Sequence, residues 1–179
     1  MGRSDLVERL IGEAEEQYRI FNQKFVVTNS NPMLGVKVPR MRAIAKEIAA
    51  GDWREFFRGY GFYVGDTAVS GDVQDFVVCG EVKEICSRAY FEEIMIIGMV
   101  INLVAVEPDV RLKLVEQFIP LIDNWGVCDV FCGGAKWVGE PGKGPKARLK
   151  VPRERVWKWS RGICWGIRRG NCREEKSLK

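Results

Sequence analysis

The sequence predicts an all-α protein built from antiparallel helix pairs. Apolar residues mostly recur at intervals of three and four positions, which is the spacing of an amphipathic helix. No segment shows sustained alternation of apolar and polar residues between hairpin turns, so strands are not expected. The expected helices are about ten to twenty residues long with short connections, which favours pairs stacked side by side. Because no strict sequence period marks repeats, a bundle and a short α-solenoid both remain open at this stage.

Three helices are expected in the first sixty residues. The first begins after Ser4, the expected N-cap, and runs through LVERLIGEAEEQYRIFNQKF to residue 25, before the turn-rich stretch TNSNPMLG. The second begins at Pro39, a residue suited to the first helical position, and stops at Gly51. Asp52 then caps a short helix, WREFFRGY, which is followed by the glycine-rich loop GFYVGDTAVSG.

The next helices are expected in DVQDFVVCGEVKEICS and AYFEEIMIIGMVINLVA. The second of these is so apolar that we place it at the centre of the core. Pro108 opens a further helix, DVRLKLVEQFI, and Pro120 ends it. Asp123 is expected to cap the helix that contains Trp125 and Asp129.

Composition excludes several kinds of site. The chain has 179 residues and no histidine, which rules out Ser-His-Asp triads, HExxH zinc sites and imidazole bases. Its six cysteines form no CxxC motif, and in a chain whose N-terminus lacks the apolar stretch of a signal peptide they are expected to be reduced thiols. A four-thiolate zinc site stays open in principle, but we expect no metal and no cofactor. No apolar run approaches a membrane span, so we expect a cytoplasmic protein.

The net charge of +4 is unevenly spread along the chain. Residues 1–137 hold 15 Lys and Arg against 20 Asp and Glu, whereas residues 138–179 hold 13 against 4. The stretch from residue 138 also carries prolines and glycines typical of a linker, and a final helix over residues 152–167 is expected within it. We therefore divide the chain into a helical domain, 1–137, and a basic, Trp-rich tail, 138–179. Such a tail either meets a polyanion or is simply solvated.

Trp125 and Asp129 stand four residues apart in the segment DNWGVCDVFC, otherwise made largely of small apolar residues. On a helix this spacing places both side chains on one face, one turn apart. Cys128 and Cys132 have the same spacing and are interpreted as small packing residues beside that face.

Three blocks in order resemble a known family: FNQKF with LGVKVPRMRAIAKEI, then YFEEIMIIGMVI, then FIPLIDNWGVCDVFC. Together they are similar to the DNA alkylation repair family, the AlkD-like DNA glycosylases with HEAT-like repeats, over about residues 15–137. The resemblance implies an α-α superhelix whose concave face holds duplex DNA, and excision of positively charged N3- or N7-alkylated purines. The tail does not match the family, and the family's catalytic-face arginine has only Arg161, Arg168 and Arg169 as candidates by residue type.

The resemblance also implies roles for individual residues. The tryptophan and aspartate of the family motif fall on Trp125 and Asp129, which are therefore the candidate catalytic residues. Phe21, Lys37 and Arg40 are the candidate DNA-binding residues, since they lie near positions that contact DNA in relatives or at an expected helix N-terminus suited to phosphate. Relatives look like monomers, so we expect a monomer.

Two other classes of function stay open beside the glycosylase. The chain could be a non-catalytic helical-repeat module that binds DNA or a protein partner, because its C-terminal part departs from the family. A protein scaffold without DNA affinity is the third class, and an acidic concave face would favour it.

Overall fold

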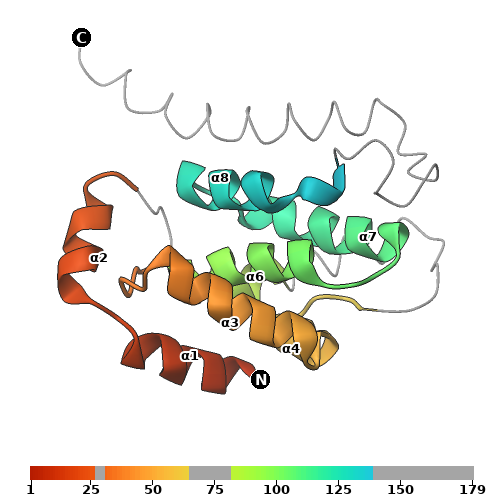
Figure 1. Cartoon of the computed structure of the whole chain (residues 1–179), viewed down its shortest axis with the longest axis horizontal. Coiled ribbons are helices and arrows are strands. Elements are labelled where there is room, and N and C mark those ends of the chain that lie inside the picture. Colours follow the sequence, from red (N-terminus) through yellow and green to blue (C-terminus); the bar gives the residue numbers. More distant parts are fainter. Residues whose placement is uncertain (27–30, 65–81, 139–179) are drawn as a thin grey trace, which may run out of the picture.

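The computed structural model describes residues 1–26, 31–64 and 82–138, and these residues form helices with no strand among them (Figure 1). This confirms the all-α prediction over the described ranges. Residues 82–86 are also helical. The main elements are α1 (Arg3–Gly12), α2 (Glu16–Gln23), α3 (Val38–Ala50), α4 (Trp53–Gly59), α6 (Phe91–Leu103), α7 (Pro108–Phe118) and α8 (Trp125–Gly134), with 3₁₀ turns η1 (Ile119–Leu121) and η2 (Lys136–Val138).

Helix α6 is the centre of the core, as its apolar sequence predicts. All its residues from Phe91 to Ile101 are buried, and the helix packs on α3 along one side and on α8 along another. Helices α7 and α1 also contact α6. A helix that is apolar all round gains most from having neighbours on every side, because each buried aliphatic side chain contributes roughly 1.5–3 kcal/mol.

A glycine and two aromatic rings set how closely α7 and α8 approach α6. A Cβ at Gly98 would stand 2.7 Å from the ring of Phe118 on α7, so only glycine leaves room for this ring. The rings of Phe118 and Phe131, on α8, lie 5.0 Å apart. The Asn102 side-chain amide at the end of α6 donates a 2.9 Å hydrogen bond to the Phe131 carbonyl. These contacts fix α8 across α6.

The loop before α3 is held by a buried carboxylate of α6. Glu92 accepts hydrogen bonds from the backbone N–H groups of Leu34, Gly35 and Val36 at 3.0, 2.7 and 3.2 Å. Gly35 has φ of 96°, and a Cβ there would lie 2.6 Å from the Glu15 carbonyl oxygen. Glycine is therefore required both by the backbone conformation and by the close approach of the neighbouring chain.

Several predicted helix ends are confirmed. Pro39 lies in the first turn of α3, which ends at Ala50 with Gly51 as its C-cap. The Asp52 side chain caps α4 by accepting a hydrogen bond from the Glu55 N–H at 3.0 Å. Pro108 is the first residue of α7, and that helix ends at Phe118.

Three local predictions were wrong. The single helix expected from residue 4 to residue 25 is two helices, α1 and α2, because the intervening residues turn back toward the loop before α3, where the Glu15 N–H bonds the Gly35 carbonyl at 3.1 Å. The N-cap of α1 is Gly2 rather than Ser4. The N-cap of α8 is Asn124 rather than Asp123, since the Asn124 side chain accepts the Val127 N–H at 3.0 Å.

Other predictions fall largely or wholly outside the described residues. These are the glycine-rich loop over 61–71, the first part of the helix expected over 72–87, and the tail 138–179 with its final helix. Within the described ranges, none of the helices is long and apolar enough to cross a membrane.

Candidate functional site

An open groove of about 540 Å³ runs between α3, α6 and α8. Met99 and Leu103 of α6 and Val130 of α8 form its apolar part. Its charged side chains are Asp129 of α8, Arg42 and Lys46 of α3, and Lys136, which follows α8. The groove therefore places one carboxylate among three cations at the surface.

Helix α8 presents both candidate catalytic residues from the same exposed face. The Asn124 cap starts the helix so that Trp125 is its first residue, and Asp129 follows one turn later. Asp129 is exposed in the groove, whereas Trp125 is 49% exposed and lies outside the groove lining. The predicted juxtaposition of the two residues is therefore present.

Trp125 belongs to an aromatic shelf, which we define as Phe21, Phe25 and Trp125. The indole N–H of Trp125 donates a 3.0 Å hydrogen bond to the Phe25 carbonyl, and this bond ties α8 to the residues just after α2. The rings of Phe21 and Phe25 lie 5.1 Å apart, and each of these residues is 57% exposed. Phe21, a predicted DNA-binding residue, thus contacts the ring of Phe25, whose backbone carbonyl binds Trp125.

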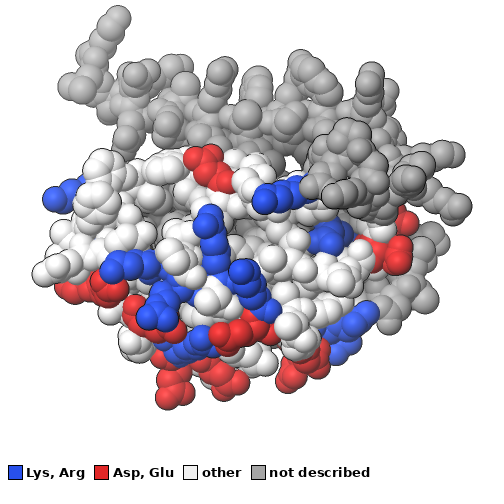
Figure 2. Space-filling model, viewed as in Figure 1, with Lys and Arg blue, Asp and Glu red and all other residues white. Residues whose placement is uncertain are grey.

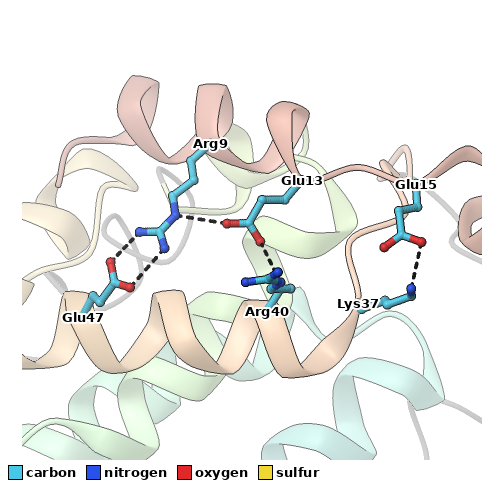
Figure 3. Close-up of polar contacts among 6 residues, drawn as sticks. All are labelled: Arg9, Glu13, Glu15, Lys37, Arg40 and Glu47. Atoms are coloured by element: carbon cyan, nitrogen blue, oxygen red, sulfur yellow. Dashed lines mark hydrogen bonds and ion pairs between the residues drawn. The ribbon is translucent and has the colours of Figure 1, made fainter.

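The other two predicted DNA-binding residues face acidic partners. Lys37 pairs with Glu15 at 2.8 Å, and Arg40 approaches Glu13 at 3.8 Å (Figure 3). Both cations are exposed, so each pair is open to competition by another anion. Lys37 and Arg40 are outside the lining of the groove that contains Asp129.

A row of alternating charges links α1 to α3 (Figure 3). Arg9 binds Glu47 through both terminal nitrogens, one of them at 3.0 Å, and its Nε lies 3.4 Å from Glu13. Hydrogen bonding between Arg9 and Glu47 raises the pKa of the guanidinium and lowers the pKa of the carboxyl. The α1-facing side of α3 is therefore largely neutralised.

The opposite side of α3 carries the cations of the groove. Arg42 and Lys46 are four residues apart, so they lie one above the other on the side turned to α8. Figure 2 shows Lys and Arg side chains gathered over α3, with acidic side chains gathered below them over α1. A polyanion that approaches this face would meet the groove cations, none of which forms an ion pair with a carboxylate of the described residues.

Sequence reasoning missed three residues of this surface: Lys46, Lys136 and Phe25. Lys46 could have been found from its four-residue spacing to Arg42, which places the two cations on one face of α3. That face differs from the one whose cations pair with the acidic residues of α1. Lys136 and Phe25 join the site because α8 packs on α6 and binds the residues that follow α2, which no local pattern shows.

A second polar cluster lies beneath α1 and is satisfied internally. Buried Glu93 accepts hydrogen bonds from Arg3 at 3.0 Å, from the Tyr60 hydroxyl at 2.6 Å and from the Tyr90 N–H at 2.6 Å. Burial and the neighbouring Glu93 carboxylate raise the pKa of Tyr60. The Glu93 oxygens are occupied by donors that join α1, α4 and α6, so this cluster holds helices together.

The described part of the chain places few potential metal-ligating side chains near one another. No group of three or more Cys, Asp or Glu side chains is arranged there to hold a metal ion. The Cys128 and Cys132 sulfurs, on successive turns of α8, lie 3.9 Å apart.

Comparison with known proteins gives no match to the chain from a family model, a curated protein or a solved structure. Function must therefore be inferred from the groove and the aromatic shelf themselves.

Proposed function

We propose that this chain is a DNA repair glycosylase that excises positively charged N3- or N7-alkylated purines from duplex DNA. The observation that carries the proposal is the groove in which Asp129 stands among Arg42, Lys46 and Lys136, one helical turn from the exposed Trp125. Cations to hold phosphate, a carboxylate to face a cationic sugar and an aromatic ring to meet a cationic base are the three parts this reaction needs.

The groove cations support binding of the DNA backbone. Phosphates are recognised by Lys and Arg side chains, and each neutralised phosphate releases counterions, which makes binding weaken as salt rises. Arg42 and Lys46 line the same side of the groove, one turn apart on α3, and suit neighbouring phosphates of one strand. The proposed partner is accordingly duplex DNA that carries alkylated bases.

Asp129 would stabilise the charge that develops during bond cleavage. An N3- or N7-alkylated purine already carries a positive charge, so it leaves without a general acid, and a chain without histidine is not at a disadvantage. As the glycosidic bond breaks, positive charge builds on the sugar, and a nearby carboxylate lowers the energy of that state. The same carboxylate can orient the attacking water.

The aromatic shelf would face the alkylated nucleotide. The Trp125 ring offers an electron-rich face to a cation, an interaction of roughly 0.5–2 kcal/mol that depends on desolvation. Phe21 and Phe25 add exposed ring surface beside it, on which a base or sugar can pack. Neutral purines would gain less from Trp125 and also leave more slowly, so selectivity would come partly from the substrate.

The finer architecture we propose is an α-α superhelix of HEAT-like repeats. The packing of α6 between α3 and α8 supports it, because helices in such a superhelix stack in a row and contact their neighbours. The groove would then belong to the concave face.

A second candidate function is a non-catalytic helical-repeat module that binds DNA. It is favoured by the exposed position of the Asp129 carboxylate, which no hydrogen bond to another described residue holds in place. Electrostatic catalysis is most effective when the stabilising group is held in place before the reaction. In this alternative the groove cations bind phosphate and Asp129 has no chemical role.

The decisive experiment measures release of alkylated bases from methylated duplex DNA by the intact protein, by Asp129→Asn and by Asp109→Asn. Asp109 is an exposed aspartate in the first turn of α7, outside the groove, and serves as the matched control. We expect Asp129→Asn to reduce the excision rate by about 10²–10³-fold, the usual effect of removing one electrostatic stabiliser. DNA affinity should stay the same or rise in this variant, because it removes a negative charge from a cationic groove.

Each other outcome has a definite meaning. Equal excision by Asp129→Asn and the intact protein would remove Asp129 from the chemistry. If the folded intact protein binds duplex DNA in a salt-sensitive manner but releases no base, the non-catalytic module is the correct function. Absence of duplex binding would overturn both.

A further inference from the structure

Helix α8 ends with two glycines, and packing requires only the second of them. A Cβ at Gly134 would stand 2.8 Å from the side-chain nitrogen of Asn102 on α6. That nitrogen is held in place, because it donates a hydrogen bond to the Phe131 carbonyl at 2.9 Å while the Asn102 oxygen accepts the Trp137 indole N–H at 2.7 Å. The close approach of α6 therefore requires glycine at Gly134.

Gly133 has no comparable structural reason to be glycine. A Cβ there would have no atom of the described residues within 4 Å, and its φ lies outside the left-handed range. It is a helical residue of α8, whose C-cap is Ala135. Glycine inside a helix is less favourable than alanine, because its backbone loses more conformational freedom on folding. Gly133 therefore weakens the helix, and no contact among the described residues compensates for this.

The position of Gly133 in the groove suggests what it does. Gly133 lines the groove and follows Asp129 by four residues, so it lies one turn further along the same face of α8. Side chains of a helix lean toward its N-terminus and cover the preceding turn. A side chain at this position would therefore lean over the Asp129 carboxylate. Glycine leaves that carboxylate uncovered on the side of the groove.

We propose that Gly133 determines access to Asp129, because its bare backbone admits a ring the size of deoxyribose beside the carboxylate. The inference rests on the proposed function, in which the sugar of the alkylated nucleotide approaches Asp129. Electrostatic stabilisation weakens as the charges move apart, so a side chain that held the sugar away would weaken it. Met99 and the 45% exposed Leu103 provide apolar surface in the same groove on which the sugar can pack.

The first test measures access to Asp129 without DNA. Surface carboxylates are labelled with a carbodiimide and an amine, and mass spectrometry gives the labelling rate at Asp129 and, as an internal reference, at Asp109. We expect Gly133→Leu to slow labelling of Asp129 severalfold and to leave Asp109 unchanged. Gly12→Leu is the matched control, because Gly12 ends α1, lies outside the groove and also has no described atom within 4 Å of its Cβ. It should change neither rate.

The second test measures base excision from methylated duplex DNA by the same variants. We expect Gly133→Leu to reduce the excision rate by about 10²-fold, the effect of displacing a reacting group by about 1 Å. Combining it with Asp129→Asn should lower the rate little further, because both changes remove the same contact.

A smaller substitution separates access from damage to the fold. Gly133→Ala should reduce excision less than Gly133→Leu does, while it raises the folding equilibrium constant in urea denaturation by about two- to fivefold. A purely structural role of Gly133 would instead couple lower excision to lower stability.

The outcomes distinguish this inference from the proposed function. Labelling of Asp129 at the intact rate in Gly133→Leu overturns the inference whatever the protein does to DNA. Equal excision by Gly133→Leu and the intact protein also overturns it and leaves the glycosylase in place. If the intact protein excises no base, the proposed function fails, and labelling alone decides whether Gly133 controls access to Asp129.

Discussion

The buried carboxylate of Glu92 is predicted to fix the position of α3, and Glu92→Gln tests this directly. Glu92 is 1% exposed, and its Oε1 accepts the N–H groups of Gly35 and Val36 while Oε2 accepts that of Leu34. Glutamine keeps one oxygen, which can serve the first two donors. Its amide NH₂ would then point at the Leu34 N–H, so that two donors face each other in a buried place.

The size of the effect follows from these three bonds. Replacing two charge-assisted hydrogen bonds by neutral ones removes about 2 kcal/mol, and the buried Leu34 donor left without an acceptor costs about 1–3 kcal/mol. The lower desolvation penalty of a neutral side chain offsets part of this sum. We expect Glu92→Gln to lower the free energy of unfolding by about 2–4 kcal/mol, measured by urea denaturation with an unchanged m-value.

Glu84→Gln is the matched control, because Glu84 is exposed and it is its backbone carbonyl, not its side chain, that accepts the hydrogen bond from the Ser87 hydroxyl. It should change the free energy of unfolding by less than about 0.5 kcal/mol. If Glu92→Gln is equally mild, then the carboxylate does not hold the loop before α3, and the proposed cause of its position is wrong.

Three further predictions test the buried cluster, the groove and an alkaline transition. Tyr60→Phe should lower the free energy of unfolding by about 1–3 kcal/mol in urea denaturation, because it removes the 2.6 Å bond to buried Glu93; a neutral result would contradict the structural role of the cluster. In duplex-binding titrations, Arg42→Gln should reduce the magnitude of the slope of log K against log salt by about 1. Lys37→Gln should reduce it less, because this variant also releases the Glu15 carboxylate. Equal slopes for the two variants would count against the groove as the site that binds phosphate. Burial raises the pKa of Cys86 to about 12 in the folded protein, whereas the same thiol has a pKa of about 8.5 in the unfolded chain. The contribution of Cys86 to stability is therefore fully present below about pH 8.5 and is lost as the pH rises toward about 12. The drop in unfolding free energy between pH 8 and pH 10 should thus be smaller in Cys86→Ala than in the intact protein, and an equal drop would refute the assignment.

Local signals in the sequence were sufficient where a helix end depends on its own residues. Pro39, Asp52 and Pro108 act through their own backbone or side chain, so the beginnings of α3, α4 and α7 could be predicted. The unbroken apolar run of α6 identified the core for the same reason.

The predictions failed where a distant residue decides the local structure. The break between α1 and α2 depends on the Glu15 N–H reaching the Gly35 carbonyl, and the amphipathic pattern across the break is continuous. Asn124 caps α8 instead of its neighbour Asp123. Asp and Asn are about equally good N-caps, so no local signal distinguishes the two positions.

The same contrast between local signals and distant contacts applies to the candidate site. The pairing of Trp125 with Asp129 on one helical face is a local property, and the structure has both on the exposed face of α8. Which cations stand near Asp129 depends instead on how α3 is rotated between α1 and α8. Arg40 and Glu47 face α1, and Arg42 and Lys46 face the groove.

This rotation of α3 determines the order in which its cations can serve a polyanion. Phosphate at the groove meets Arg42 and Lys46 directly, whereas phosphate at Lys37 must first displace Glu15. Because the Lys37–Glu15 pair is exposed, breaking it costs only about 0–1 kcal/mol, so under the proposed function Lys37 could still contribute to a DNA complex. The displaced Glu15 carboxylate would then stay close to the bound phosphate and repel it, which offsets part of the gain. Initial capture by the groove and weaker, later contact at the N-terminus of α3 is the arrangement that these contacts favour.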